Sequence, residues 1–221
     1  MKHTLIISGG HINLEFAGNY MKQNEFNRVI AVDGGLLAAD RLGVVPDCIV
    51  GDFDTVSPLL LYKYEQMDNV TIKRYRPEKD YSDTYIAMKA AIEEESLSVH
   101  IIGALGGRFD HSLANVQLLQ YALNHGIESI LVSEKNRIRL LGDKRQNIIL
   151  EKRNSPYKYV SLLPFTDKVS SVTTMGMKYN INNHDFYINK EISLGISNEI
   201  LDEVAEIRIA GGQLLLVESN D

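Results

Sequence analysis

The sequence is poor in cysteine and has no long apolar run. Cys48 is the single cysteine among 221 residues, so no intramolecular disulfide bond can form, as is usual in a reducing compartment. No basic residue lies beside Cys48 in the run 46–50, which favours a packed thiol over a nucleophile. The first apolar run stops at Gly9-Gly10, and no stretch suits a signal peptide or a membrane span. We therefore expect a cytoplasmic protein without a membrane partner.

The sequence also lacks an excess of positive charge and the common nucleotide-binding motifs. Its 23 Lys and Arg against 29 Asp and Glu give a net charge of −6, which argues against a nucleic-acid partner. Neither a Walker sequence nor a Gly-x-Gly-x-x-Gly fingerprint is present, so ordinary P-loop and dinucleotide-binding folds are disfavoured. With 44% hydrophobic and 24% charged residues, the chain can form one large or two small globular domains.

The first part of the chain alternates short apolar runs with helical patterns. The runs that suit buried strands are 5–8, 29–32, 49–50, 70–73, 100–103 and 129–132. Helices are expected at 36–42, at 59–67 after the N-cap Ser57 and Pro58, at 85–94 and at 112–124 before Gly126. This alternation predicts an α/β domain over residues 1–135, with a mostly parallel sheet covered on both faces.

After about Asn136 the pattern becomes β-rich. Short runs suited to strands occur at 148–150, 159–163, 169–173, 186–188, 204–209 and 213–217, with a possible hairpin turn at 182–185. No long helical pattern is present there. We expect residues 136–221 to form a second domain, an all-β sandwich or an open barrel, packed closely against the first because no flexible linker separates them.

The segment Asp33-Gly34-Gly35 stands where a predicted strand gives way to a helix. Glycines at this position let backbone N–H groups approach a ligand, and the helix N-terminus that follows favours an anion. A plain strand-to-helix turn has the same sequence pattern, so this segment alone does not decide between the two interpretations.

The segment 51–55 carries two aspartates. If the chain is still extended there, Asp52 and Asp54 point to one side and Phe53 packs on the other. Paired carboxylates without Cys or His suggest Mg²⁺ rather than Zn²⁺. A solvated acidic turn before Ser57 is the alternative.

The segment 78–84 combines Lys79, Asp80 and Asp83 at a predicted helix start. Helix initiation accounts for the pattern, with Asp80 or Ser82 as the N-cap and Asp83 in the first turn. That structure still allows Asp83 to face a metal ion and Lys79 to face a phosphate.

The segment 103–111 follows a buried strand and contains Gly106, Gly107, Arg108, Asp110 and His111. Its glycines can shape a loop around phosphate oxygens, and a guanidinium offers a fork of donors that matches them. His111 can act as a general base, cap the helix or pack. Because all four segments follow predicted strands, they should meet at one edge of the sheet and support Mg²⁺-dependent transfer from a nucleotide.

In content, order and spacing, the four segments resemble the signature of the thiamine pyrophosphokinase family. The resemblance continues in Gly176-Met177-Lys178-Tyr179 and in 195–199, so it covers nearly the whole chain. It implies an α/β nucleotide-binding domain followed by a β-sandwich, in a homodimer. It also implies thiamine sites between the α/β domain of one subunit and the β domain of the other, with ATP and thiamine as substrates.

The resemblance also assigns roles to residues. For Mg²⁺ they are Asp52, Asp54 and Asp83, and for catalysis these three with Asp80 and Arg108. For ATP they are Asp33, Gly34, Gly35, Lys79, Gly106, Gly107, Arg108, Asp110 and His111, and for thiamine Tyr179, Ser197 and Asn198. Thr55 replaces the usual serine and keeps its hydroxyl. Tyr179 stands where tryptophan is common, and tyrosine packs against a cationic ring more weakly than tryptophan does.

Three functions are compatible with these residues. The first is diphosphate transfer from ATP to thiamine. The second is Mg²⁺-dependent phosphate transfer to another alcohol, which the β-domain motifs disfavour. The third is a catalytically silent nucleotide- or thiamine-sensing module, which has less need of closely placed metal ligands.

Overall fold

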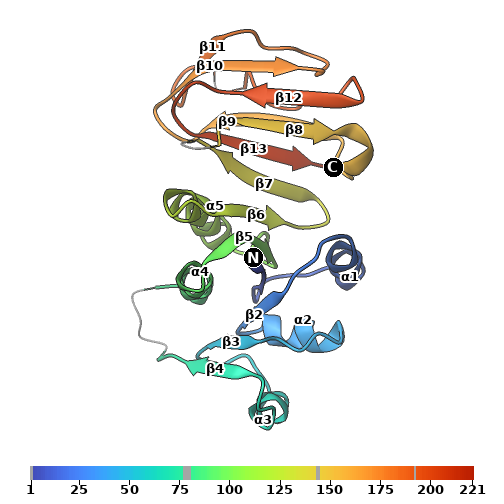
Figure 1. The fold of residues 1–221 in the computed structure, drawn as a ribbon, viewed down its shortest axis with the longest axis vertical. Helices are drawn as coiled ribbons and strands as arrows, with labels where there is room; N and C mark the ends of the chain where they lie inside the picture. The colour runs from blue at the N-terminus through green and yellow to red at the C-terminus, as the bar shows by residue number, and fades with distance from the viewer. Residues whose placement is uncertain (1, 77–80, 143–144, 192) are drawn as a thin grey trace. The chain divides into compact units, whose positions relative to one another are not determined.

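The computed structural model describes residues 2–76, 81–142, 145–191 and 193–221. The chain divides into two compact units, Met1–Glu134 and Lys135–Asp221. The first is built on a parallel sheet covered by helices, and the second on antiparallel strands (Figure 1). The predicted mixed α/β class is confirmed.

The first unit contains a parallel sheet whose central strands are largely buried. In the order of the sheet these are β4 (Thr71–Arg74), β3 (Cys48–Gly51), β2 (Arg28–Val32), β1 (Lys2–Ile7), β5 (Ser96–Ile102) and β6 (Glu128–Val132). Each pairs with its neighbour in parallel. Runs such as Val29–Val32 lack a polar face because helices pack on both sides of the sheet.

Helices α1 (Leu14–Gln23) and α2 (Gly35–Arg41) lie on one face of this sheet, and α4 (Asp83–Glu93) and α5 (Phe109–Asn124) lie on the other (Figure 1). Helix α3 (Pro58–Glu65) packs on a cluster that contains Ile49 and Phe53. Helix α1 was not predicted from the sequence. It begins at the N-cap Asn13, whose side chain accepts a hydrogen bond from Phe16 N at 3.0 Å.

The strand order places a topological switch point between β1 and β5. The chain runs from β1 through β2 and β3 to β4, and then returns to β5 on the other side of β1. The loops that follow β1 and β5 therefore leave the sheet in opposite directions, and open α/β sheets bind ligands in the crevice between such loops.

The second unit has two antiparallel sheets. One contains β7 (Asn136–Leu141), β13 (Leu214–Ser219) and β9 (Tyr159–Pro164). The other has the order β11 (His184–Tyr187), β10 (Lys168–Met175), β12 (Val204–Arg208) and β8 (Asn147–Glu151), and a short 3-10 helix spans Lys152–Asn154. Strands of both sheets contribute to one hydrophobic cluster, including Leu162, Val172, Ile207 and Leu216. The hairpin turn predicted at 182–185 is wrong, because β11 already begins at His184 and a longer connection precedes it.

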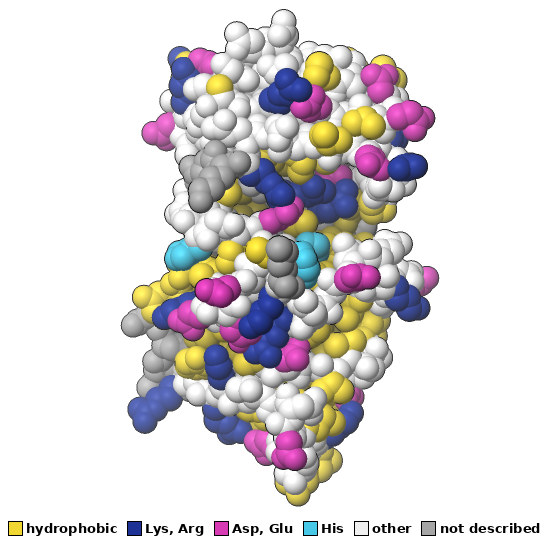
Figure 2. All heavy atoms as spheres, viewed as in Figure 1, with side chains coloured by type: hydrophobic (Ala, Val, Ile, Leu, Met, Phe, Trp, Pro, Cys, Tyr) yellow, Lys and Arg dark blue, Asp and Glu magenta, His cyan; other side chains and the backbone are white. Residues whose placement is uncertain are grey.

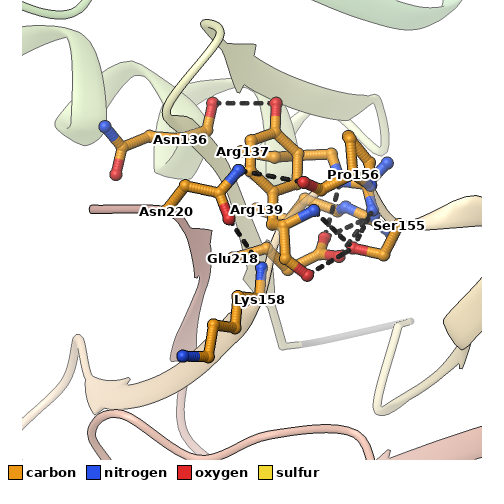
Figure 3. Close-up of polar contacts among 9 residues, drawn as sticks. Asn136, Arg137, Arg139, Ser155, Pro156, Lys158, Glu218 and Asn220 are labelled. Carbon is orange, nitrogen blue, oxygen red and sulfur yellow. Dashed lines mark hydrogen bonds and ion pairs between the residues drawn. The ribbon is translucent and has the colours of Figure 1, made fainter.

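One end of this core is charged. Glu218 is fully buried on β13, on the same face as Leu216, and accepts hydrogen bonds from Arg137, Arg139 and Ser155 (Figure 3). The Arg137 Nε–Glu218 Oε2 distance is 2.6 Å, and that from Arg139 Nη2 to the same oxygen is 2.8 Å. Burial raises the pKa of Glu218, but the two guanidinium groups outweigh it and hold the pKa below its usual value. The carboxylate is thus charged and fully paired.

Candidate active site

A cavity of about 400 Å³ lies at the carboxyl edge of the parallel sheet, at the switch point between β1 and β5. This volume is in the range of small-molecule sites. Loops after β1, β2, β3 and β5 and the first turns of α4 and α5 line it. The lining residues are Ser8–His11, Val32–Gly34, Asp54, Thr55, Ser82–Thr84, Gly103, Ala104, Gly106–Arg108, His111 and Asn115.

The cavity brings together residues predicted from all four sequence segments. Those that line it are Asp33, Gly34, Asp54, Asp83, Gly106, Gly107, Arg108 and His111. Gly35, Asp52 and Asp110 do not line it. Lys79 and Asp80 lie outside the described residues, so the structure places neither of them.

Asp33 is held by the loop after β3. Its backbone is left-handed, with φ of 44°, and its Oδ1 accepts a hydrogen bond from Asp52 N at 3.1 Å. A Cβ atom on Gly51 would lie 1.7 Å from the same oxygen, so any side chain there would displace the Asp33 carboxylate. Burial, and then the charge and hydrogen bond of Asp83, raise the pKa of Asp33 to about 7. The cavity therefore holds aspartates that disfavour one another's charge.

The loop after β3 is not extended, so Asp52 and Asp54 do not share one side by strand alternation. Phe53 has φ of 66° and is buried, as predicted, but through a turn. Asp52 Oδ1 accepts a hydrogen bond from Asp54 N at 3.1 Å, which closes that turn. Asp54 consequently lines the cavity, while Asp52 supports the loop behind it.

The donor set of the cavity suits a hard cation, because Asp33, Asp54, Asp83 and Thr55 all present oxygen. Across the described ranges, no group of three or more His, Cys, Asp or Glu side chains could by itself hold a metal ion. Mg²⁺ commonly binds through one or two carboxylates together with substrate phosphates and water. The residues present therefore fit an ion that arrives with a polyphosphate.

Two helix N-termini lie at the cavity. Ser82 caps α4 by accepting a hydrogen bond from Tyr85 N at 3.2 Å, and Asp83 occupies the first turn. Helix initiation, one of the two interpretations of this segment, is thus confirmed, and Asp83 still lines the cavity. Helix α5 begins after Arg108. Both termini favour a bound anion.

The glycine-rich loop after β5 is held by side chains of α5, and no atom of the described residues lies close over Gly106 or Gly107. Asn115 on α5 is buried and donates to Ala104 O at 2.8 Å, and Ser112 Oγ accepts from Gly106 N at 3.1 Å. Gly106 and Gly107 have φ of 104° and 63°, and no atom would contact a Cβ on either. The loop is thus held in a conformation that leaves space over its backbone.

Arg108 and His111 lie on the exposed rim of the cavity. The guanidinium forks onto Asp110, with Nε–Oδ1 at 3.2 Å and Nη2–Oδ2 at 2.5 Å. Asp110 accordingly raises the pKa of Arg108, and Arg108 lowers that of Asp110. His111 is exposed, which argues against its packing into the core. The fork is therefore already formed and lies on the protein surface.

In the second unit, the residues that the resemblance assigns to thiamine come from two paired segments. Lys178 N donates to Glu199 O at 2.9 Å, and Met177 forms a bridge with Ile200. The Tyr179 side chain is 66% exposed, whereas Asn198 is buried. Ser197 is exposed, has φ of 55°, and is anchored by its N–H to Ser161 Oγ at 3.0 Å. The structure thus brings these three residues together within one unit.

Residues 19–131 match the family model of the thiamin pyrophosphokinase catalytic domain, and residues 146–214 match that of the thiamin pyrophosphokinase vitamin B1 binding domain. The chain belongs to the thiamine pyrophosphokinase family. Thiamine pyrophosphokinase of Bacillus subtilis (strain 168) is 30% identical over 223 residues, covering 100% of both chains. Thiamine pyrophosphokinase 1 of Oryza sativa subsp. japonica is 28% identical over 76% of this chain and 64% of its own length.

Solved structures agree with the family. The crystal structure of thiamine pyrophosphokinase from Bacillus subtilis has a TM-score of 0.87 at 27% identity and covers 100% of both chains. Thiamin pyrophosphokinase from Candida albicans has a TM-score of 0.79 at 19% identity, which supports the fold alone. The predicted family is confirmed.

Several cavity residues were not predicted from the sequence. They are Ser8, Gly9, Gly10 and His11 after β1, Thr84 on α4 and Asn115 on α5. The first four had a visible signal, since a glycine pair after a buried strand is also the pattern of Asp33-Gly34-Gly35. Ser8 and Thr84 share a hydrogen bond of 2.8 Å in the cavity wall, and no sequence pattern foretells a contact between residues so far apart in the chain.

Within the described residues, no helix is both long and apolar enough to cross a membrane. On the face drawn in Figure 2, basic and acidic side chains are intermixed.

Proposed function

We propose that this chain transfers the diphosphate group of ATP to the primary hydroxyl of thiamine, giving thiamine diphosphate and AMP. The observation that carries the proposal is the cavity in which Asp54, Asp83, Arg108 and two helix N-termini converge at the switch point of the sheet. Carboxylates for a cation and donors for an anion in one cavity suit a magnesium polyphosphate. Membership of the family supports thiamine as the acceptor.

In this mechanism the thiamine oxygen bonds to the β-phosphorus of ATP. The bond from that phosphorus to the α,β-bridging oxygen breaks, AMP leaves with this oxygen, and the hydroxyl proton is lost. Arg108 and the N-termini of α4 and α5 stabilise the charge on the transferred group. Asp54 and Asp83 at the cavity wall, with Asp52 close behind them on the same loop as Asp54, would hold Mg²⁺ together with the phosphates, and the ion would offset further negative charge on the polyphosphate.

The remaining site residues take their roles from the same proposal. Asp33, Gly34, Gly35, Gly106, Gly107, Asp110 and His111 serve the ATP site, as do Lys79 and Asp80 outside the described residues. Residues 1–135 form the ATP- and Mg²⁺-binding catalytic domain, and 136–221 form a β-sandwich whose thiamine site includes Tyr179, Ser197 and Asn198. The protein works in the cytoplasm.

The reaction is tested by measuring AMP with and without thiamine. AMP that forms only when thiamine and Mg²⁺ are both present supports the proposal. Formation of ADP would instead indicate ordinary phosphoryl transfer to an alcohol. Binding of ATP or thiamine without any nucleotide product would indicate the sensing module, an alternative for which the comparisons offer no support.

We also propose a homodimer whose active sites are shared between subunits, as family membership suggests. The test mixes a subunit carrying Asp54→Asn with one carrying Tyr179→Ala and Ser197→Ala, at a thiamine concentration at which neither homodimer is active. In a shared site, each heterodimer has one site with all defects and one with none, so up to half of the wild-type activity returns. Heterodimers that form and stay inactive would refute sharing without affecting the assignment of the reaction.

A further inference from the structure

Asn198 is fixed to a core strand of the second unit by its backbone. Its N–H donates to Val160 O at 3.0 Å, and its carbonyl accepts from Val160 N at 2.8 Å. Val160 lies on β9 and is 1% exposed, and Asn198 is 7% exposed. The position of Asn198 is thus set by the core of the unit, independently of what its side chain does.

The side-chain amide of Asn198 makes nearly all of its possible hydrogen bonds within the protein. Oδ1 accepts from Tyr179 N at 3.1 Å and from Glu199 N at 2.9 Å, and Nδ2 donates to Tyr179 O at 2.7 Å. An asparagine amide offers two acceptor sites and two N–H groups, so both acceptor sites and one donor are occupied. Rotating the amide by 180° would place Nδ2 against two backbone N–H groups, so the contacts themselves fix its orientation.

Tyr179 is held by its backbone and leaves its ring exposed. Asn198 bonds both the N–H and the carbonyl of Tyr179, as a neighbouring strand would, while the side chain is 66% exposed. Lys178 Nζ lies 5.8 Å from the centre of the ring and 2.9 Å from Glu199 Oε1. An exposed aromatic ring on a fixed backbone is prepared to stack on a flat or cationic ligand.

We propose that Asn198 is a positioning residue for thiamine binding, acting through Tyr179 and not by touching the ligand. This inference rests on the proposed function, which makes thiamine the ligand of this surface. Fixing the backbone of Tyr179 in advance lowers the entropy lost when its ring stacks on a ligand. Direct recognition by Asn198 would have to use its one remaining N–H or break a bond that it already makes.

The test is a double-mutant cycle of Asn198→Asp and Tyr179→Ala, measured as the KM for thiamine in AMP formation. Asn198→Asp keeps the acceptor for the two N–H groups and places a carboxylate oxygen against Tyr179 O. Each single variant should raise the KM for thiamine about tenfold and leave the KM for ATP unchanged. If Asn198 acts through Tyr179, the double variant also stays about tenfold above wild type. A double variant near a hundredfold, or a folded Asn198→Asp with unchanged KM, would overturn the inference.

Asn220→Asp provides the matched control. Asn220 likewise bridges two backbone groups, accepting from Lys158 N at 2.8 Å and donating to Pro156 O at 2.9 Å (Figure 3). It should lower thermal stability as Asn198→Asp does, with no change in the KM for thiamine. If Asn198→Asp does not fold, Asn198→Ser takes its place in the cycle with the same expected coupling.

Failure of the proposed function has a separate signature. If the wild type forms no thiamine-dependent AMP, the proposed function fails, and the cycle is measured as thiamine affinity by calorimetry. The same tenfold losses without additivity would then still support the inference. Wild-type protein that binds no thiamine would overturn it.

Discussion

Asp33 in the first unit and Glu218 in the second are both withdrawn from water, yet their pKa values move in opposite directions. The charges near Asp33 are those of Asp83 and Asp52, and they add to burial in raising its pKa. Glu218 is buried more completely, but Arg137 and Arg139 lower its pKa in spite of that burial. The sign of the neighbouring charge decides the outcome more than depth does.

The comparison separates a structural charge from a functional one. The second unit supplies every charge that Glu218 needs, so the folded chain is sufficient by itself. The cavity of the first unit gathers Asp33, Asp54 and Asp83, and a bound cation would relieve the repulsion that helps to raise the pKa of Asp33. Loss of a carboxylate should therefore lower activity in the first unit and stability in the second.

The largest effect is expected for Asp54→Asn, which removes charge from the cavity without changing its shape. We expect activity to fall by about 100-fold or more, since Mg²⁺ binding and charge stabilisation both weaken, while the unfolding midpoint in urea stays near that of wild type. The control is Asp68→Asn, which changes an exposed aspartate of the same unit outside the cavity. Wild-type rates for Asp54→Asn at low Mg²⁺ would remove this residue from the site.

Glu218→Gln should have the opposite result to Asp54→Asn, with a large loss of unfolding free energy and an unchanged rate of AMP formation. The amide keeps an acceptor for Ser155 but removes the negative charge that two partly buried guanidinium groups, 18% and 15% exposed, share. Breaking such a pair costs about 3 kcal/mol of unfolding free energy. Urea titration measures this loss, and Glu151→Gln in the exposed pair with Arg153 is the control, expected near zero. Equal losses in both variants would show that the buried cluster is not special.

The pH dependence of the unfolding free energy provides a second test of Glu218. Because the folded-state pKa of Glu218 is lowered from 4.5, its stabilising effect is complete above that value and is lost as the pH falls through the folded pKa. Wild-type protein should therefore lose stability below about pH 4.5 more steeply than Glu218→Gln. Parallel curves in urea titrations from pH 6 to pH 3 would mean that Glu218 is not ionised in the folded protein.

Local patterns predicted the elements well, and long-range contacts account for what they missed. Val29–Val32 and Ser57-Pro58 were recognised because a buried run and an N-cap are local signals. The left-handed Phe53 was not, since that turn depends on the close approach of Gly51 to Asp33. The apolar run 213–217 stops just before Glu218, and only pairing with β7 brings two arginines beside it.

Arg108→Lys should have a smaller effect on the cavity than Asp54→Asn. Lysine keeps the charge but loses the planar fork that Arg108 now presents to Asp110. We expect kcat to fall about tenfold, with a smaller rise in the KM for ATP, because the fork matters most as charge develops. Steady-state kinetics separate the two constants, with Arg153→Lys as a surface control. A change confined to the KM for ATP would make Arg108 a ground-state binder only.

The smallest effect on stability is expected for Asp33→Asn, which tests the comparison directly. An asparagine can still accept the hydrogen bond from Asp52 N and tolerates the left-handed backbone, so the local structure is kept. Above about pH 7, where Asp33 is ionised, the change also removes a charge beside Asp83 and Asp52, which offsets the loss of any favourable contact. We therefore expect the unfolding free energy, measured in urea with a chelator present, to change by less than about 1 kcal/mol. A loss as large as that of Glu218→Gln would mean that Asp33 stabilises the fold as an anion. Asp33 and Glu218 would then both stabilise the fold as anions, despite the opposite charges of their neighbours.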